Sequence, residues 1–106
     1  MKFYHATFAA KAQKIIHTRK LCSRAKPYVY VTNTPKVRDA YGDGTVLEVT
    51  LAPGLTVELD DEFSSGRKDY RIATRRDKCV PLLDAKIVRK QTKWWRSRTS
   101  ASPRGA

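Results

Sequence analysis

Acidic residues are scarce in this chain and absent from both of its ends. The 106 residues include 22 Lys and Arg against 10 Asp and Glu, a net charge of +12. The first acid is Asp39 and the last is Asp84, so both terminal segments are purely basic. Such a field attracts polyanions through counterion release and steers an anionic dinucleotide toward a cleft. The simpler alternative is that the excess charge only keeps the protein soluble.

Cysteine and long apolar runs are equally rare. Cys22 and Cys79 have neither the spacing of a metal site nor the density of a secreted disulfide scaffold. We therefore expect two reduced thiols in a cytosol, although a bridge between them stays open. No run approaches the roughly 18 apolar residues of a membrane span, and Lys11 and Lys14 interrupt the only candidate signal-peptide core. The expectation is a cytoplasmic protein with no membrane partner.

Several motifs that would identify a common enzyme class are missing. The chain has no glycine-rich phosphate loop, no Cys and His spacing for zinc, and no G-x-S-x-G nucleophile elbow. These absences argue against a P-loop nucleotidase, a zinc-ligated domain and an α/β-hydrolase. We expect no bound metal.

Length and composition predict one folded unit. The 106 residues are 41% apolar and 30% charged, which is ordinary globular composition. Residues 91–106 are rich in Arg, Ser and Thr and cannot bury enough apolar surface to offset chain entropy. We predict a single domain over 1–90 and a basic, partly disordered tail over 91–106.

Hydrophobic periodicity predicts a small α+β domain dominated by strands. Apolar residues at helical spacing predict an amphipathic helix over 7–17 with Thr7 as its N-cap, and Thr34-Pro35 predicts a short second helix ending at Tyr41. The acidic residues 60–62 are expected in a loop. Alternating or β-branched runs predict strands at 2–5, 28–32, 45–51, 55–59, 69–73 and 85–88.

Three segments, taken in order, carry a resemblance to a known family. They are Phe-Tyr-His-Ala-Thr at 3–7, Tyr-Val-Tyr-Val-Thr at 28–32 leading to Ala-Tyr-Gly at 40–42, and Lys-Asp-Tyr-Arg-Ile at 68–72. Together they resemble the ADP-ribosyltransferase fold of the His-Tyr-Glu class, as far as about residue 88. The resemblance implies two packed, mainly antiparallel sheets with two short N-terminal helices, and NAD as a substrate.

The resemblance also implies a nicotinamide site. His5 matches the histidine that hydrogen-bonds a ribose hydroxyl, and the backbone at Ala6 and Thr7 matches the segment that holds the carboxamide, with Ala6 where the family usually has glycine. Tyr30 and Tyr41 match the tyrosines that sandwich the nicotinamide ring.

The catalytic acid is the least regular part of the match. Asp69 stands where the family usually has glutamate, and a carboxylate there would stabilise the oxocarbenium-like sugar left when nicotinamide departs. Asp60 or Asp61 is a second possible position, and a chain without any catalytic acid is a third reading. The predicted catalytic set is therefore His5, Tyr30 and Asp69.

These residues predict an NAD-dependent mono-ADP-ribosyltransferase that releases nicotinamide and modifies a macromolecular acceptor, either protein or nucleic acid, as a monomer. Two alternatives stay open: a non-catalytic, basic nucleic-acid-binding module on the same fold, and an enzyme resembling the NAD-dependent RNA 2′-phosphotransferases. Small size suggests a toxin or effector by analogy. Cations and tryptophans that suit acceptor or nucleic-acid contacts are Arg75, Arg76, Lys93, Trp94, Trp95 and Arg96.

Overall fold

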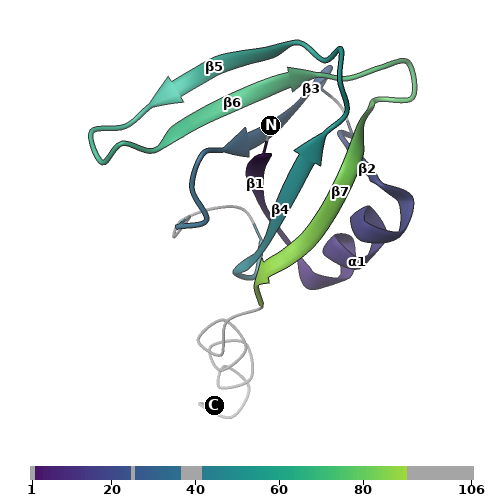
Figure 1. The fold of residues 1–106 in the computed structure, drawn as a ribbon, viewed down its shortest axis with the longest axis horizontal. Helices are drawn as coiled ribbons and strands as arrows, with labels where there is room; N and C mark the ends of the chain where they lie inside the picture. The colour runs from purple at the N-terminus through teal and green to yellow at the C-terminus, as the bar shows by residue number, and fades with distance from the viewer. Residues whose placement is uncertain (1, 25, 37–41, 91–106) are drawn as a thin grey trace, which may run out of the picture.

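The part of the chain that the structure describes forms a single seven-stranded antiparallel sheet with one helix against it. The computed structural model describes residues 2–24, 26–36 and 42–90, so the predicted tail at 91–106 lies outside the described part. The strand order is β2-β7-β4-β1-β3-β6-β5 (Figure 1). The elements are β1 Lys2–Thr7, α1 Ala9–Thr18, β2 Lys20–Cys22, β3 Tyr28–Thr32, β4 Thr45–Leu51, β5 Val57–Glu62, β6 Lys68–Ala73 and β7 Cys79–Arg89.

Strand β1 has two very different neighbours. On one side β4 pairs with all of it, from Lys2 opposite Thr50 to Thr7 opposite Thr45. On the other side β3 pairs with it only where Tyr4 faces Thr32. The strands β3, β6 and β5 therefore turn away from β1, β4 and β7, as Figure 1 shows. This divergence opens the space in which the candidate site lies.

The core follows the predicted alternation. Leu47, Val49 and Leu51 of β4 are buried as predicted, and Ile72 of β6 is buried with Tyr70 packed against the core. Helix α1 contributes Ala12 and Ile15, which are also buried. The strands predicted at 28–32 and 45–51 have the bounds of β3 and β4. Strict periodicity was sufficient to predict these central elements.

The start of α1 depends on a residue far away in the sequence. Phe8 occupies the N-cap position without a side-chain cap, so the prediction that Thr7 caps the helix is wrong. Instead, Oδ2 of Asp43 accepts the N–H of Ala9 at 3.0 Å. Oδ1 of Asp43 accepts the Thr45 hydroxyl at 2.6 Å and the Thr45 N–H at 3.1 Å. Burial alone would raise the pKa of Asp43, but these hydrogen bonds from Thr45 and Ala9 lower it.

Several predicted boundaries need correction because pairing between strands decides them. Strand β2 was not predicted, β7 begins at Cys79 rather than at residue 85, and the acidic residues 60–62 belong to β5 rather than to a loop. As an edge strand, β5 gains from these charges, which discourage pairing with another chain. The expected division into two sheets is not confirmed. The second helix was predicted over 34–41, of which 37–41 lie outside the described residues.

The cysteines form a disulfide, which corrects the prediction of two reduced thiols. Cys22 and Cys79 lie opposite each other in the β2–β7 pair, with Cα atoms 3.9 Å apart. The bond spans 57 residues, and a loop of that length corresponds to about 4 kcal/mol of stabilisation in the chain-entropy account. The disulfide could not be predicted from the sequence because it depends on β2, a three-residue strand too short to be recognised from its own residues.

Gly42 is the glycine that the fold requires most. Its φ is +114°, and a Cβ at this position would overlap the backbone of Thr7, including the carbonyl oxygen. We predict that Gly42→Ala lowers the free energy of unfolding by about 3 kcal/mol or more, measured by urea denaturation. Gly54 is the matched control, because its φ is +81° and nothing lies near its missing Cβ; Gly54→Ala should cost only about 1 kcal/mol. Equal losses in the two variants would contradict this account.

Candidate active site

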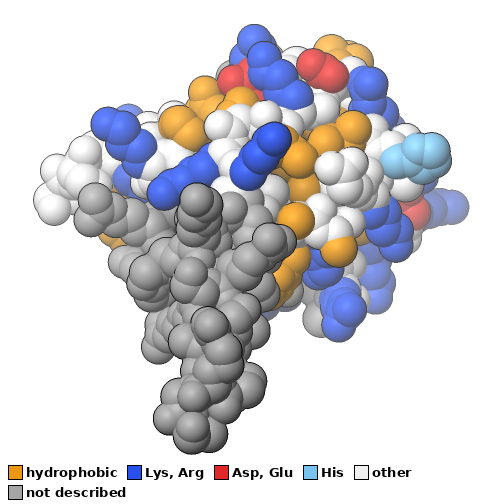
Figure 2. Space-filling model, turned by 90° about the horizontal axis from the view of Figure 1, so that it is seen from below, with side chains coloured by type: hydrophobic (Ala, Val, Ile, Leu, Met, Phe, Trp, Pro, Cys, Tyr) orange, Lys and Arg blue, Asp and Glu red, His pale blue; other side chains and the backbone are white. Residues whose placement is uncertain are grey.

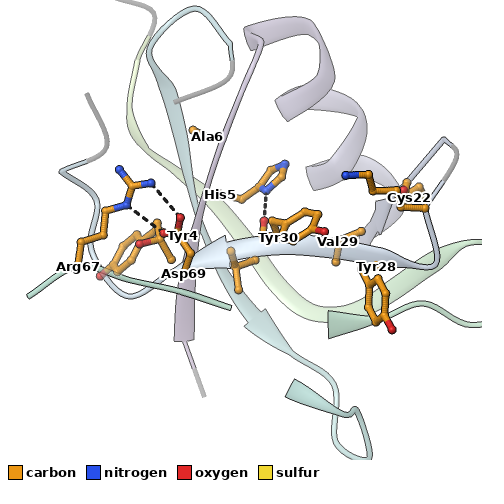
Figure 3. Close-up of a pocket in the computed structure, with 13 residues that line it drawn as sticks. Tyr4, His5, Ala6, Cys22, Tyr28, Val29, Tyr30, Arg67 and Asp69 are labelled. Atoms are coloured by element: carbon orange, nitrogen blue, oxygen red, sulfur yellow. Dashed lines mark hydrogen bonds and ion pairs between the residues drawn. The ribbon is translucent and has the colours of Figure 1, made fainter. Parts of the chain in front are cut away.

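A cavity of about 460 Å³ opens where β1 and β3 diverge. Its size lies within the usual range for small-molecule sites. Figure 3 shows its residues, with the imidazole of His5 and the ring of Tyr30 near the middle. It is lined by Tyr4, His5 and Ala6 of β1, Cys22, Ser23 and Lys26 at the end of β2 and beyond, residues 28–32 of β3, and Arg67 and Asp69 near β6.

His5 is held in one protonation state. Its Nδ1 lies 2.8 Å from the backbone oxygen of Tyr30 (Figure 3). Because a carbonyl oxygen only accepts, Nδ1 carries the proton and Nε2 keeps a free lone pair. Desolvation by burial lowers the pKa of His5 and nearby Lys11 lowers it further, while the hydrogen bond to Tyr30 opposes the shift. A neutral imidazole with an acceptor nitrogen is thus the resting form at pH 7.

Tyr30 supplies an aromatic surface beside that imidazole. Its side chain is 39% exposed, although it stands on a central strand, because β1 has separated from β3 at this level. Nζ of Lys26 lies 5.7 Å from the centre of the Tyr30 ring, so a cation stands next to the same surface. The predicted opposing ring, Tyr41, lies outside the described residues.

Of the two residues after His5, Ala6 lines the cavity and Thr7 does not. Ala6 lines the cavity, as expected for a backbone contact. Thr7 does not line it; its side chain is 1% exposed, and its carbonyl receives the N–H of Asp43 at 3.4 Å. Gly42 packs closely against the backbone of Thr7 and covers it. The assignment of Thr7 to the nicotinamide site is therefore not supported by its position.

Asp69 lines the cavity, but it is not alone. Nε and Nη2 of Arg67 each donate to one oxygen of Asp69, both at 2.9 Å. Figure 3 places this pair, beside Tyr4, on one side of His5 and Tyr30. A carboxylate has about four acceptor positions, so Asp69 retains acceptor capacity on both oxygens. The two parallel hydrogen bonds fix the direction of the carboxylate.

The alternative acids are placed differently. Asp60 lies 3.8 Å from Arg71 in an ion pair, and Asp61 accepts the N–H of Glu62 at 2.8 Å. Neither lines the cavity, since β5 is separated from β3 by β6. Among the acids that the sequence singled out, only Asp69 shares a cavity with His5 and Tyr30.

Sequence reasoning missed several polar residues of the cavity, among them Arg67 and Thr32. Arg67 stands two residues before Asp69, a spacing that puts side chains on one face of a strand and could have indicated the pair. No sequence pattern indicated a role for Thr32. Thr32 lines the cavity, and its Oγ1 is buried without a hydrogen-bond partner among the described residues. A buried, unsatisfied hydroxyl beside a cavity is available to a ligand.

Residues predicted to contact an acceptor are only partly placed. Arg75 and Arg76 are exposed in the loop between β6 and β7, whereas Lys93, Trp94, Trp95 and Arg96 lie outside the described residues. Within the described ranges, no three His, Cys, Asp or Glu side chains gather in a way that could hold a metal ion. No helix in those ranges is both long and apolar enough to cross a membrane.

The lowered pKa of His5 has a measurable consequence. Its folded-state pKa lies below the usual value of about 6.5, so on acidification the unfolded chain takes up this proton first. The His5 contribution to stability is then complete above about pH 6.5 and falls as the pH drops toward the folded-state pKa. We predict that the imidazole titrates below pH 6.5 by NMR, and that His5→Gln flattens the pH dependence of unfolding in that window. A midpoint at or above 6.5 would contradict the neutral resting form.

Comparison with protein-family models, with curated proteins and with solved structures finds no match to this chain. The function is therefore inferred from the cavity and from the sequence motifs that build it.

Proposed function

We propose that this protein is an NAD-dependent mono-ADP-ribosyltransferase. The observation that carries the proposal is a neutral histidine, fixed by the Tyr30 carbonyl at 2.8 Å, in one cavity with the ring of Tyr30 and the carboxylate of Asp69. These three residues were singled out by motifs far apart in the sequence, and their convergence on one cavity is what the resemblance to ADP-ribosyltransferases requires.

The residues can divide the task of binding NAD among themselves. The nicotinamide ring stacks on Tyr30, where an exposed aromatic face is available. A ribose hydroxyl donates to Nε2 of His5, whose lone pair is free because Nδ1 is engaged with the Tyr30 carbonyl. The carboxamide lies against the backbone at Ala6, which lines the same cavity. Binding of this kind orients the ribose for the reaction at its anomeric carbon.

The chemical step needs negative charge near the sugar. The bond between the anomeric carbon and the nicotinamide nitrogen breaks, its electron pair leaves with nicotinamide, and positive charge develops on the ribose. Asp69 stabilises that charge, and the two hydrogen bonds from Arg67 hold the carboxylate in a fixed direction. A nucleophilic oxygen or nitrogen of the acceptor then bonds the anomeric carbon and loses its proton to solvent.

The alternatives have weaker support. An RNA 2′-phosphotransferase would need arginines that contact phosphate, yet Arg19 is engaged with the Leu83 carbonyl and Asp84, and Arg71 with Glu58. Arg24, a further candidate, forms no ion pair among the described residues. Arg19, Arg24 and Arg71 do not line the cavity, and Arg38 lies outside the described residues. A non-catalytic basic module would bind no NAD, so the same experiment separates it from the proposed enzyme.

Nicotinamide release from labelled NAD tests the proposal. We expect His5→Ala and Asp69→Asn each to lower the rate at least about a hundredfold, because each removes a group that acts on the ribose in the transition state. Asp61→Asn is the matched control: it removes one carboxylate from the neighbouring strand without touching the cavity, and it should keep the wild-type rate.

Three outcomes would contradict the proposal. They are the absence of NAD binding by calorimetry, the absence of nicotinamide release with every protein and nucleic-acid acceptor tried, and an Asp69→Asn variant as active as the Asp61→Asn control.

A further inference from the structure

Two loops at one end of the cavity bring together cations that have no acidic partner in the part of the chain that the structure describes. The loop between β2 and β3 carries Arg24 and Lys26, and the loop between β6 and β7 carries Arg75, Arg76 and Lys78; all are exposed. We call these five residues the basic loop pair. No sequence pattern links the first loop to the second, which lies about 50 positions further along the chain.

The two loops lie side by side and are tied together at three points. The N–H of Ser23 bonds the Lys78 carbonyl at 2.9 Å, and the N–H of Thr74 bonds the Pro27 carbonyl at 3.0 Å. The Cys22–Cys79 disulfide joins the residue before the first loop to the residue after the second. These ties hold the cations near one another before any ligand arrives, which lowers the ordering cost of binding.

The charge of the basic loop pair is not neutralised locally. Each carboxylate in the described part of the chain already has a hydrogen-bond or ion-pair partner; the one inside the second loop, Asp77, bonds Lys20 at 3.1 Å and the Cys79 N–H. Among the described residues, Arg24, Arg75, Arg76 and Lys78 form no ion pair. Figure 2, which views the molecule from below, shows scattered Lys and Arg side chains in blue and fewer Asp and Glu side chains in red.

The basic loop pair adjoins the cavity. Cys22, Ser23 and Lys26 line the cavity, and Figure 3 places Cys22 and Tyr28 at the end opposite Arg67 and Asp69. Lys26 belongs to both the cavity wall and the loop pair, and its ammonium lies over the Tyr30 ring. A ligand that follows the cations therefore passes the mouth of the cavity.

We propose that the basic loop pair binds the phosphate backbone of a single-stranded nucleic acid and presents that strand to the cavity as the acceptor. Nucleic acid is favoured over an acidic protein, because the described loop residues include no apolar side chain except Pro27 to anchor a protein interface. Phosphate contacts from arginine and lysine need no such anchor. The proposed nucleic-acid binding does not depend on the transferase function, whereas the acceptor role rests on the proposed transferase function.

The test uses a fluorescently labelled single-stranded oligonucleotide and the full chain. Replacing Arg24, Arg75, Arg76 and Lys78 by Gln should weaken binding at least about tenfold at moderate salt and reduce the slope of log affinity against log salt by about 0.7 per cation. Lys26 stays unchanged because it lines the cavity. The matched control replaces four other cations without an ion pair in the described residues, Lys14, Lys36, Arg89 and Lys90, by Gln.

The outcomes separate the two proposals. The control variant should retain most of the affinity, and both variants should bind NAD as the wild type does. Equal loss in the two variants, or binding of anionic lipid vesicles or an acidic polypeptide in preference to the oligonucleotide, would overturn the assignment of the basic loop pair. A wild-type chain that binds the oligonucleotide but not NAD would instead refute the transferase function and leave the binding surface intact.

Discussion

The hydrogen bond between Nδ1 of His5 and the Tyr30 carbonyl connects two strands that otherwise separate. Beyond the single pair of Tyr4 and Thr32, β3 no longer follows β1, and the imidazole donates to a carbonyl to which the N–H of a neighbouring strand would otherwise donate. The bond fixes the histidine tautomer, and both His5 and the exposed Tyr30 line the cavity. Fold and candidate chemistry thus share one structural cause, the divergence of β1 from β3.

Sequence patterns predicted the parts of the fold that depend on local periodicity. The alternation in 45–51, the β-branched run at 28–32 and the apolar stripe that includes Ala12 and Ile15 correspond to β4, β3 and α1. The parts that they missed depend on contacts between distant residues. Asp43 caps α1 from 34 positions away, and the short β2 is stabilised by pairing with β7 and by the disulfide.

In the candidate site, too, sequence motifs indicated individual residues but not the contacts between them. Motifs indicated His5, Tyr30 and Asp69, and the structure brings all three to one cavity. They did not indicate that Arg67 holds Asp69, and they could not indicate that Gly42 packs against the backbone of Thr7 or that the Thr32 hydroxyl lacks a partner among the described residues. Charge is also organised across the cavity: one end has an acid paired with arginine, and the other opens onto unneutralised cations.

The central claim is that nicotinamide lies against Tyr30 and beside His5. Intermolecular nuclear Overhauser effects between free nicotinamide and the protein measure this contact directly, without requiring turnover. The account predicts cross-peaks from the nicotinamide ring protons to the ring protons of Tyr30 and to the imidazole of His5, and their loss in Tyr30→Leu. Nicotinamide that contacts neither side chain at millimolar concentration would contradict it.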